Sequence, residues 1–230
     1  MGDRTKCQNS LRPSQVGHEI LGMSRSTVCG SRQRQISCEF RMTLTLTTVL
    51  FVGGESRRMG ADKATLMIAG KPLWSRQLDA LRRMQPDKLL ISGRFRPSWT
   101  PDDIEVVLDE PPSRGPLSGL AAALKEMQTT HLLALAVDLP EMSTEHLLTL
   151  WRCARLGLGV IPQWDNHYEP MAAIYPASVA SMAERALAAG NLALQAFIER
   201  ILEHNCVCVH PISISDRQLY RNVNSPEDLK

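Results

Sequence analysis

The sequence predicts an α/β fold in which helices cover both faces of a single, mostly parallel β-sheet. From Thr43 onward, short apolar segments alternate with segments of helical periodicity. The apolar segments are apolar throughout instead of on alternate residues, which is typical of strands buried on both faces. A chain of 230 residues is also long enough for one sizeable core. We therefore predict a three-layer α/β/α architecture around a Rossmann-like sheet.

Each expected element follows from its local pattern. The first strand, TTVLFV at 47–52, is β-branched and apolar. The first helix places Leu73, Leu78 and Leu81 on one stripe, and Pro72 suits its first turn. The remaining patterns predict strands at 88–92, 104–108, 132–137, 158–162, 171–175 and 206–210, and helices at 72–84, 119–127, 143–155, 176–189 and 194–204.

Charge divides the chain into two regions. Residues 1–41 hold seven Lys/Arg against three Asp/Glu, whereas the other 189 residues hold 19 against 21. The first region has no apolar stretch of a secretory signal, and Met42 stands directly before Thr43, where the pattern of strands and helices begins. We expect 1–41 to be a disordered extension or an artefact of the assigned start site, and 42–230 to be one folded domain.

Two classes of partner are not expected. The sequence has no apolar run near the roughly 18 residues of a membrane helix, and no Lys-rich or aromatic cluster for nucleic acid. Its six cysteines include no C-x-x-C pair and no zinc-site spacing. We therefore expect a cytoplasmic protein with reduced thiols and without a membrane or nucleic-acid partner.

The loops that follow the strands are the places to look for a ligand, because parallel sheets bind ligands beyond the carboxyl ends of their strands. The first such loop, FVGGESRRMGADK at 51–63, begins with Gly53 and Gly54 and carries Arg57, Arg58 and Lys63. Glycines let backbone N–H groups approach an anion closely, and the three cations add positive charge. This combination suits a polyphosphate. The alternative is a solvated turn with incidental arginines.

Two aspartates also follow predicted strands. Asp138 ends the strand within LAVDLP, and Asp109 ends IEVVL in the same way. Mg²⁺ is held by one or two carboxylates together with phosphates and waters, so Asp138 alone would suffice. The alternative for Asp138 is a turn or helix-capping residue before Pro140.

Two further segments carry candidate contacts. GPLSGL at 115–120 places two glycines before a helix, where N–H groups can face an anion. In NVNSPEDL at 222–229, SPED suits the start of a helix. Asn222 and Asn224 would then project from one side of an extended segment toward a ligand.

Together these segments resemble the nucleotidyltransferases of molybdenum cofactor synthesis, above all the GTP-dependent molybdenum cofactor guanylyltransferases. That family opens with L-A-G-G-x-S-x-R-M-G-x-D-K, and residues 51–63 follow it closely. GKPLWSR (70–76), GPLSGL, VDLP, EPMAAIY (169–175) and NVNSPEDL come in the family's order. Phe51 and Val52 replace the usual Leu-Ala, and Ser92 stands where relatives often have Asn. The resemblance covers about residues 46–230 and implies the nucleotidyltransferase fold.

The resemblance also implies residue roles. It implies nucleotide binding by Phe51, Val52, Gly53, Gly54, Arg57, Lys63, Asp109 and Asp138. Lys63 and Asp138 would be the catalytic residues, with Lys63 on the phosphates and Asp138 holding Mg²⁺. Asn222 and Asn224 would face the pterin substrate.

The implied reaction transfers GMP from GTP to the terminal phosphate of molybdopterin, the organic part of the molybdenum cofactor, and releases pyrophosphate. Molybdenum-insertion proteins and apo-molybdoenzymes are the protein partners that the resemblance implies. Three alternatives stay open: a CTP-dependent cytidylyltransferase on the same pterin, another small-phosphate nucleotidyltransferase, and a non-catalytic GTP-binding module.

Overall fold

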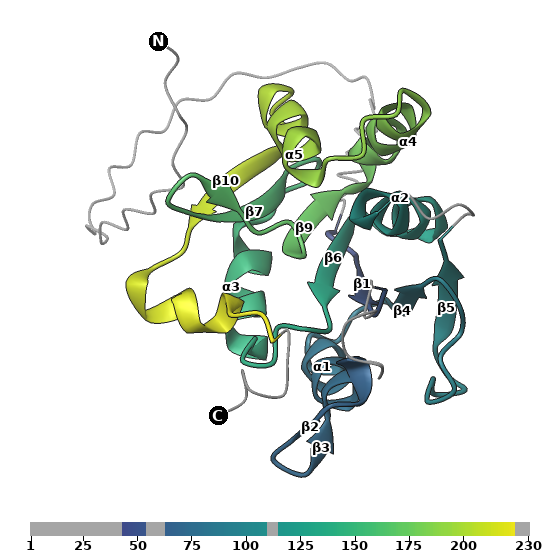
Figure 1. The fold of residues 1–230 in the computed structure, drawn as a ribbon. Coiled ribbons are helices and arrows are strands. Elements are labelled where there is room, and N and C mark those ends of the chain that lie inside the picture. Colours follow the sequence, from purple (N-terminus) through teal and green to yellow (C-terminus); the bar gives the residue numbers. More distant parts are fainter. Residues whose placement is uncertain (1–42, 54–62, 110–114, 224–230) are drawn as a thin grey trace, which may run out of the picture. The chain divides into compact units, whose positions relative to one another are not determined.

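The structure, a computed structural model, describes residues 43–53, 63–109 and 115–223. The described residues form one eight-stranded sheet in the order β10-β7-β9-β6-β1-β4-β5, with β8 paired to β7 (Figure 1). Neighbouring strands along this order are parallel except at β9, which runs antiparallel to both β6 and β7. The predicted mostly parallel sheet is therefore confirmed.

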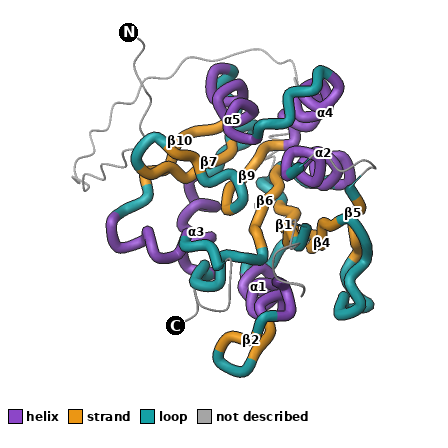
Figure 2. The backbone as a smooth tube through the Cα atoms, in the orientation of Figure 1, coloured by secondary structure: helices purple, strands orange, loops and turns teal. Residues whose placement is uncertain are grey.

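Strands and helices alternate along most of the described chain (Figure 2). The strands are β1 (Leu46–Phe51), β2 (Met67–Ile68), β3 (Lys71–Pro72), β4 (Lys88–Gly93), β5 (Glu105–Leu108), β6 (His131–Ala136), β7 (Gly159–Trp164), β8 (His167–Tyr168), β9 (Ala172–Pro176) and β10 (Val207–Pro211). The helices are α1 (Leu73–Arg83), α2 (Pro116–Glu126), α3 (Thr144–Cys153), α4 (Ala180–Ala188) and α5 (Leu194–Glu203), with 3₁₀ turns η2 (Lys63–Thr65), η3 (Ala177–Val179) and η4 (Ile214–Tyr220).

The core lies in two layers, one on each face of the sheet. Successive strand residues point to opposite faces, so Val49 packs with α2, α4 and α5, whereas Leu50 packs with α1, α3 and η4. Figure 1 shows α2, α4 and α5 grouped on one side of the strands. Both layers are apolar, which explains why the strands are apolar throughout. The predicted α/β/α arrangement is thus confirmed.

The register of the central strands brings their carboxyl ends together. Phe51, the last residue of β1, lies beside Ser92 of β4 on one side and Ala136 of β6 on the other. Because these strands are parallel and in step, the segments that follow them leave the sheet at the same edge.

The local predictions differ from the structure in a few places. Helix α2 begins at Pro116 instead of 119, because Pro116 occupies its first turn after Gly115, which has φ 84°. The sequence patterns did not predict the β2–β3 hairpin, β8 or η4, which are short and have weak periodicity. The expected extension at 1–41 lies outside the described residues. Among the residues that the structure describes, no helix combines the length and apolar character needed to cross a membrane.

The buried histidine at the start of β6 predicts how stability depends on pH. His131 is fully buried, with Nδ1 2.9 Å from Thr130 Oγ1 and Nε2 3.3 Å from the Leu158 carbonyl oxygen. Burial lowers the pKa of His131 below its ordinary 6.5, against the opposing effect of backbone hydrogen bonds with Leu158 and Arg155. The unfolded chain therefore takes up a proton near pH 6.5 that the folded chain does not. His131 therefore does not lower the free energy of unfolding above this pH, and lowers it progressively as the pH falls below it.

We expect His131→Gln to flatten this decline. The wild-type free energy of unfolding should lose up to about 1.4 kcal/mol per pH unit from this residue below pH 6.5. Urea unfolding of both proteins at several pH values between 8 and about 5 measures the difference. His146 and His210, whose pKa values are also lowered by burial, act equally in both proteins and cancel. Identical pH dependence in the two proteins would contradict the assignment.

Candidate active site

A cleft of about 380 Å³ opens at the carboxyl edge of β1, β4 and β6. Its walls come from the ends of these strands, the start of α2, the segment before β9 and the segment after η4. The residues that line it are Phe51, Val52, Gly53, Lys63, Ser92, Gly93, Arg94, Asp109, Gly115, Pro116, Gly119, Ala136, Val137, Asp138, Leu139, Glu169, Pro170, Met171 and Asn222.

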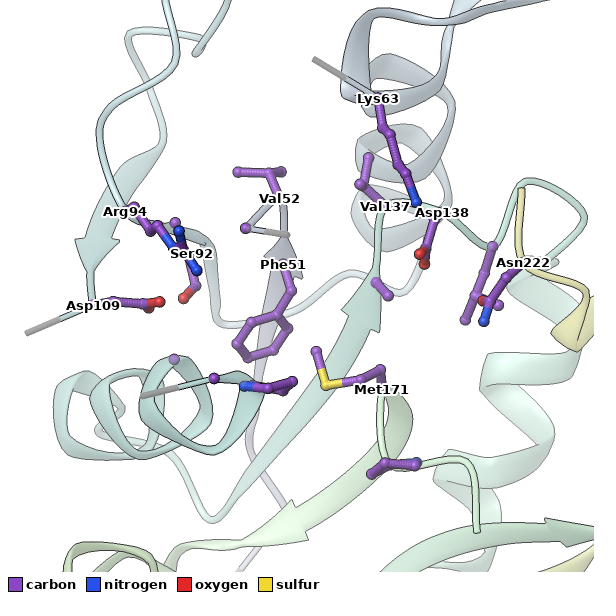
Figure 3. Close-up of a pocket in the computed structure, with 18 of the residues that line it drawn as sticks. Phe51, Val52, Lys63, Ser92, Arg94, Asp109, Val137, Asp138, Met171 and Asn222 are labelled. Atoms are coloured by element: carbon purple, nitrogen blue, oxygen red, sulfur yellow. The ribbon is translucent and has the colours of Figure 1, made fainter. Parts of the chain in front are cut away.

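The polar side chains gather at two ends of this cleft. Figure 3 shows Ser92, Arg94 and Asp109 at one end, and Lys63, Asp138 and Asn222 at the other. Phe51 and Met171 lie between the two groups (Figure 3). An elongated ligand could thus meet different polar groups at its two ends while its middle contacts apolar surface.

A glycine makes the first end narrow. A Cβ added at Gly119 of α2 would lie 2.9 Å from Asp109 Oδ1, 3.1 Å from Ser92 Oγ and 3.2 Å from Phe51 Cε1. Only a residue without a side chain therefore fits here with these side chains in place. Within the described part of the chain, Ser92 Oγ is buried and has no hydrogen-bond partner. Because a buried hydroxyl without a partner is costly, a ligand at this end would satisfy it.

The second end combines a buried carboxylate with a cation. Burial raises the pKa of Asp138 above its ordinary 3.8, and the positive charge of Lys63 opposes this rise. Figure 3 shows the Lys63 side chain extending from η2 toward the Asp138 carboxylate. Lys63 thus favours the ionised form of Asp138, which is the form that can bind a metal ion.

The backbone around Asp138 is tied to three other segments. The Val137 N–H donates to the Phe51 carbonyl at 3.0 Å, and the Val223 N–H donates to the Asp138 carbonyl at 2.9 Å. The side chain of Gln77, which is buried in α1, donates to the Leu139 carbonyl. Asp138 is therefore held at the edge of the sheet by β1, α1 and the segment after η4.

A third carboxylate, after Asp109 and Asp138, lies on the wall formed by the segment before β9. Glu169 is half-buried, and its N–H donates to the Pro162 carbonyl at 2.9 Å. Burial raises the pKa of Glu169 above its ordinary 4.5, while the nearby His167 lowers it. Glu169 and Asp138 thus both place desolvated carboxylates in the same cleft.

The donors in the cleft fit Mg²⁺ bound together with a phosphate ligand. The described residues contain no cluster of three or more His, Cys, Asp or Glu side chains able to hold a metal. Asp138 offers one carboxylate, and Mg²⁺ commonly takes one or two carboxylates and completes its shell with phosphates and waters. The residues present therefore suit a metal that arrives with a polyphosphate.

Most of the side chains singled out in the sequence meet in this cleft. Phe51, Val52, Gly53, Lys63, Asp109, Asp138 and Asn222 all line it. Gly54, Arg57 and Asn224 lie outside the described residues.

Sequence reasoning did not single out two charged residues of the cleft, Arg94 and Glu169. Arg94 could have been found, because it follows β4 by one residue at the same sheet edge. Glu169 lies between β8, which the sequence patterns did not predict, and β9, so a search of the loops after the predicted strands passes over it.

Comparisons with known proteins agree with this geometry. The pattern of the "MobA-like NTP transferase domain" family matches residues 48–206. A "probable molybdenum cofactor guanylyltransferase" of Opitutus terrae is 34% identical over 186 residues, which cover 80% of this chain and 92% of the relative. A "molybdenum cofactor guanylyltransferase" of Pseudomonas fluorescens is 30% identical over 185 residues, covering 79% and 90%.

A solved structure has the same fold. "Molybdopterin-guanine dinucleotide biosynthesis protein A" of Archaeoglobus fulgidus superposes with a TM-score of 0.62 at 26% identity, covering 80% of this chain and 94% of that protein. The names of these relatives agree with the function that the sequence resemblance implied. The cleft at the carboxyl edge of a mostly parallel sheet, the family pattern over residues 48–206 and the similarity to these relatives together establish that this chain belongs to the MobA-like NTP transferase family of nucleotidyltransferases.

Proposed function

We propose that this enzyme transfers GMP from GTP to the terminal phosphate of molybdopterin and releases pyrophosphate. The observation that carries the proposal is the single cleft shared by Lys63 and Asp138 at the carboxyl edge of the sheet. The relatives with the same family pattern supply the substrate class, because their names specify a guanylyltransferase of the molybdenum cofactor.

The chemistry joins two anions. An oxygen of the molybdopterin phosphate attacks the α-phosphorus of GTP, a new P–O bond forms, and the bond to the β-phosphate oxygen breaks. The nucleophile is already ionised at neutral pH, so no general base is needed. Catalysis then depends on positioning and on neutralising charge. Lys63 would hold the phosphates, and the Asp109 end of the cleft would hold the nucleoside.

The proposed metal is Mg²⁺ on Asp138. When bound there, Mg²⁺ neutralises phosphate charge near the reacting bond. Asp138 would orient the triphosphate through this contact, while Lys63 keeps the Asp138 carboxylate ionised. Asn222, beside Asp138 in the cleft, would face the pterin substrate (Figure 3). The same role is proposed for Asn224, and nucleotide binding for Gly54 and Arg57, by family resemblance alone.

The guanine base is supported by the polar groups at the first end of the cleft. Guanine offers N–H donors on one edge and N7 and O6 acceptors on another. The Asp109 carboxylate can accept from the donors, and Arg94 can donate to the acceptors. A CTP-dependent transferase on the same pterin is the main alternative.

The test is pyrophosphate release by the full chain with molybdopterin, Mg²⁺ and each nucleoside triphosphate in turn. We expect release with GTP that requires Mg²⁺ and greatly exceeds release with CTP, ATP or UTP. Preference for CTP would refute the guanine assignment. Pyrophosphate release that does not depend on molybdopterin would refute the assignment of molybdopterin as the acceptor. GTP binding without any pyrophosphate release would favour a non-catalytic module.

Gly119→Ala should weaken nucleotide binding without harming the fold. The added methyl group would displace the Asp109 and Ser92 side chains, which lie within about 3 Å of its position. The KM for GTP should rise about tenfold or more. The urea midpoint should change little, because the preference of a helix for Ala over Gly, about 1 kcal/mol, offsets the crowding of Phe51 Cε1 at 3.2 Å. Glu126→Ala, on an exposed turn of the same helix, is the control. An unchanged KM would place the nucleotide elsewhere.

The cellular location and the protein partners of this enzyme are also part of the proposal. We propose a cytoplasmic location, supported by cysteine usage without a disulfide framework. Molybdenum-insertion proteins and apo-molybdoenzymes would be the protein partners, as the family resemblance implies.

A further inference from the structure

The segment that brings Asn222 to the cleft is anchored at both of its ends. At one end, the Tyr220 hydroxyl lies 2.6 Å from His146 Nε2. At the other, the Val223 N–H donates to the Asp138 carbonyl at 2.9 Å. Tyr220 and Val223 are buried, whereas Asn222 between them is exposed and lines the cleft. The two anchors therefore leave only residues 221 and 222 projecting into solvent.

Both anchors attach to the stretch of chain formed by the loop after β6, which contains Asp138, and the helix α3 that follows it. His146 lies in the first turn of α3, the helix that follows the Asp138 loop directly. Ser143 caps this helix, because its Oγ accepts from the His146 N–H at 3.2 Å. The ring of Tyr220 meets the ring of His146 edge to face, with centroids 5.4 Å apart at 86°. The His146–Tyr220 pair thus connects η4 to the first turn of α3, the helix that follows the Asp138 loop.

The hydrogen bond joins two uncharged groups at neutral pH. Burial lowers the pKa of His146, with Asp216 opposing the shift and His210 adding to it. Burial, together with the charges of Glu169 and Asp216, raises the pKa of Tyr220. Removing either partner would leave a buried polar atom of the other unsatisfied, which is costly. The segment after Tyr220 would then be held near the cleft by the Val223–Asp138 backbone bond and by the burial of the Val223 side chain.

We propose that His146 and Tyr220 are positioning residues for the acceptor side of the cleft, holding residues 221–223 against the Asp138 loop so that Asn222 is placed for the second substrate. This inference rests on the proposed function, in which Asn222 faces molybdopterin. His146 itself does not contact the substrate in this proposal. The pair acts on the acceptor through Asn222 and leaves the nucleoside end of the cleft unaffected.

Amide hydrogen exchange tests the positioning without any substrate. In Tyr220→Phe, the Val223 amide should exchange at least about tenfold faster than in the wild type, since it loses its neighbouring anchor. The Ala136 amide, which donates to the Met171 carbonyl at 2.8 Å, is the internal reference and should not change. An unchanged exchange rate at Val223 would overturn the proposal, whatever reaction the enzyme catalyses.

Kinetics test the functional consequence. Tyr220→Phe and His146→Leu should each raise the KM for molybdopterin about tenfold, the cost of a lost buried hydrogen bond, while the KM for GTP stays within about twofold. His146→Gln should restore the molybdopterin KM, because its amide can reach the position of Nε2. The double variant should be no worse than either single variant, because both remove the same interaction.

A matched histidine separates positioning from general loss of stability. His131 is also buried and hydrogen-bonded but lies at the opposite edge of the sheet, at the start of β6. His131→Gln should leave both KM values unchanged. Equal changes in the two KM values of Tyr220→Phe would overturn the proposal. A wild-type enzyme that releases no pyrophosphate would refute the proposed function instead, and the exchange rate at Val223 would still decide this inference.

Discussion

Asp138→Ala should abolish Mg²⁺-dependent pyrophosphate release, lowering kcat/KM by about 10³-fold or more, as expected when a metal-held transition-state contact is lost. Asp138 shares the cleft with Lys63, whose charge favours the ionised form of Asp138, and the Asp138 carbonyl accepts from the Val223 N–H. Without it, the metal would lose the carboxylate that the proposed mechanism places beside Lys63 and the triphosphate. Pyrophosphate release over a Mg²⁺ titration measures the loss, with the exposed Asp103, paired with Arg82 at 3.1 Å, as the alanine control.

The fold should tolerate this substitution. Burial raises the pKa of Asp138, which means that folding disfavours the charged form of this carboxylate. Removing that charge should leave the free energy of unfolding unchanged or higher at pH 7. Loss of activity with retained stability would identify a functional carboxylate. An unchanged rate and metal dependence would remove Asp138 from the proposed mechanism.

Lys63→Ala should lower turnover by about 10²- to 10³-fold, the range seen when one charged stabilising group is removed from an active site. In the proposed mechanism two effects combine, since the triphosphate would lose a cation and Asp138 loses the charge that favours its ionised form. Initial rates at saturating GTP measure the loss. Lys71→Ala is the matched control, because Lys71 lies in the β2–β3 hairpin and pairs with Asp79 outside the cleft. Near-normal turnover would exclude Lys63 from the reaction.

The pH profile gives this variant a second readout. The positive charge of Lys63 lowers the pKa of Asp138, so its removal must raise that pKa further. Asp138 would then stay protonated to a higher pH and bind Mg²⁺ only above it. The acidic limb of the rate profile in Lys63→Ala should therefore shift toward higher pH. A limb at the wild-type position would show that the two side chains do not interact in the active enzyme.

Much of the cleft could be predicted from short stretches of sequence. Phe51, Asp109 and Asp138 come at or just after the ends of apolar strands. Parallel strands present their carboxyl ends at one edge, so their following residues were expected to converge there, and the structure places all three around one cleft.

Glu169 could not be found in this way because β9 reverses direction. It precedes β9, and the antiparallel pairing of Ala172 with Leu135 brings the start of this strand to the edge where its neighbours end. The reversal follows from the β7–β8 hairpin, whose Asp165 adopts φ 41° in a short turn without strong periodicity. A rule based on loops after strands therefore misses the residue.

The same distinction holds for the whole chain. A strand buried on both faces needs apolar residues at nearly every position, whereas a helix needs a stripe of apolar residues on one side. Local sequence therefore establishes the α/β class and the residue types at the strand ends. The strand order and the arrival of Asn222 beside Asp138 depend on pairings between distant segments, such as Val223 with Asp138 and Tyr220 with His146. The periodicity of apolar residues within one segment does not specify such pairings, because they depend on how all the segments pack together in the core.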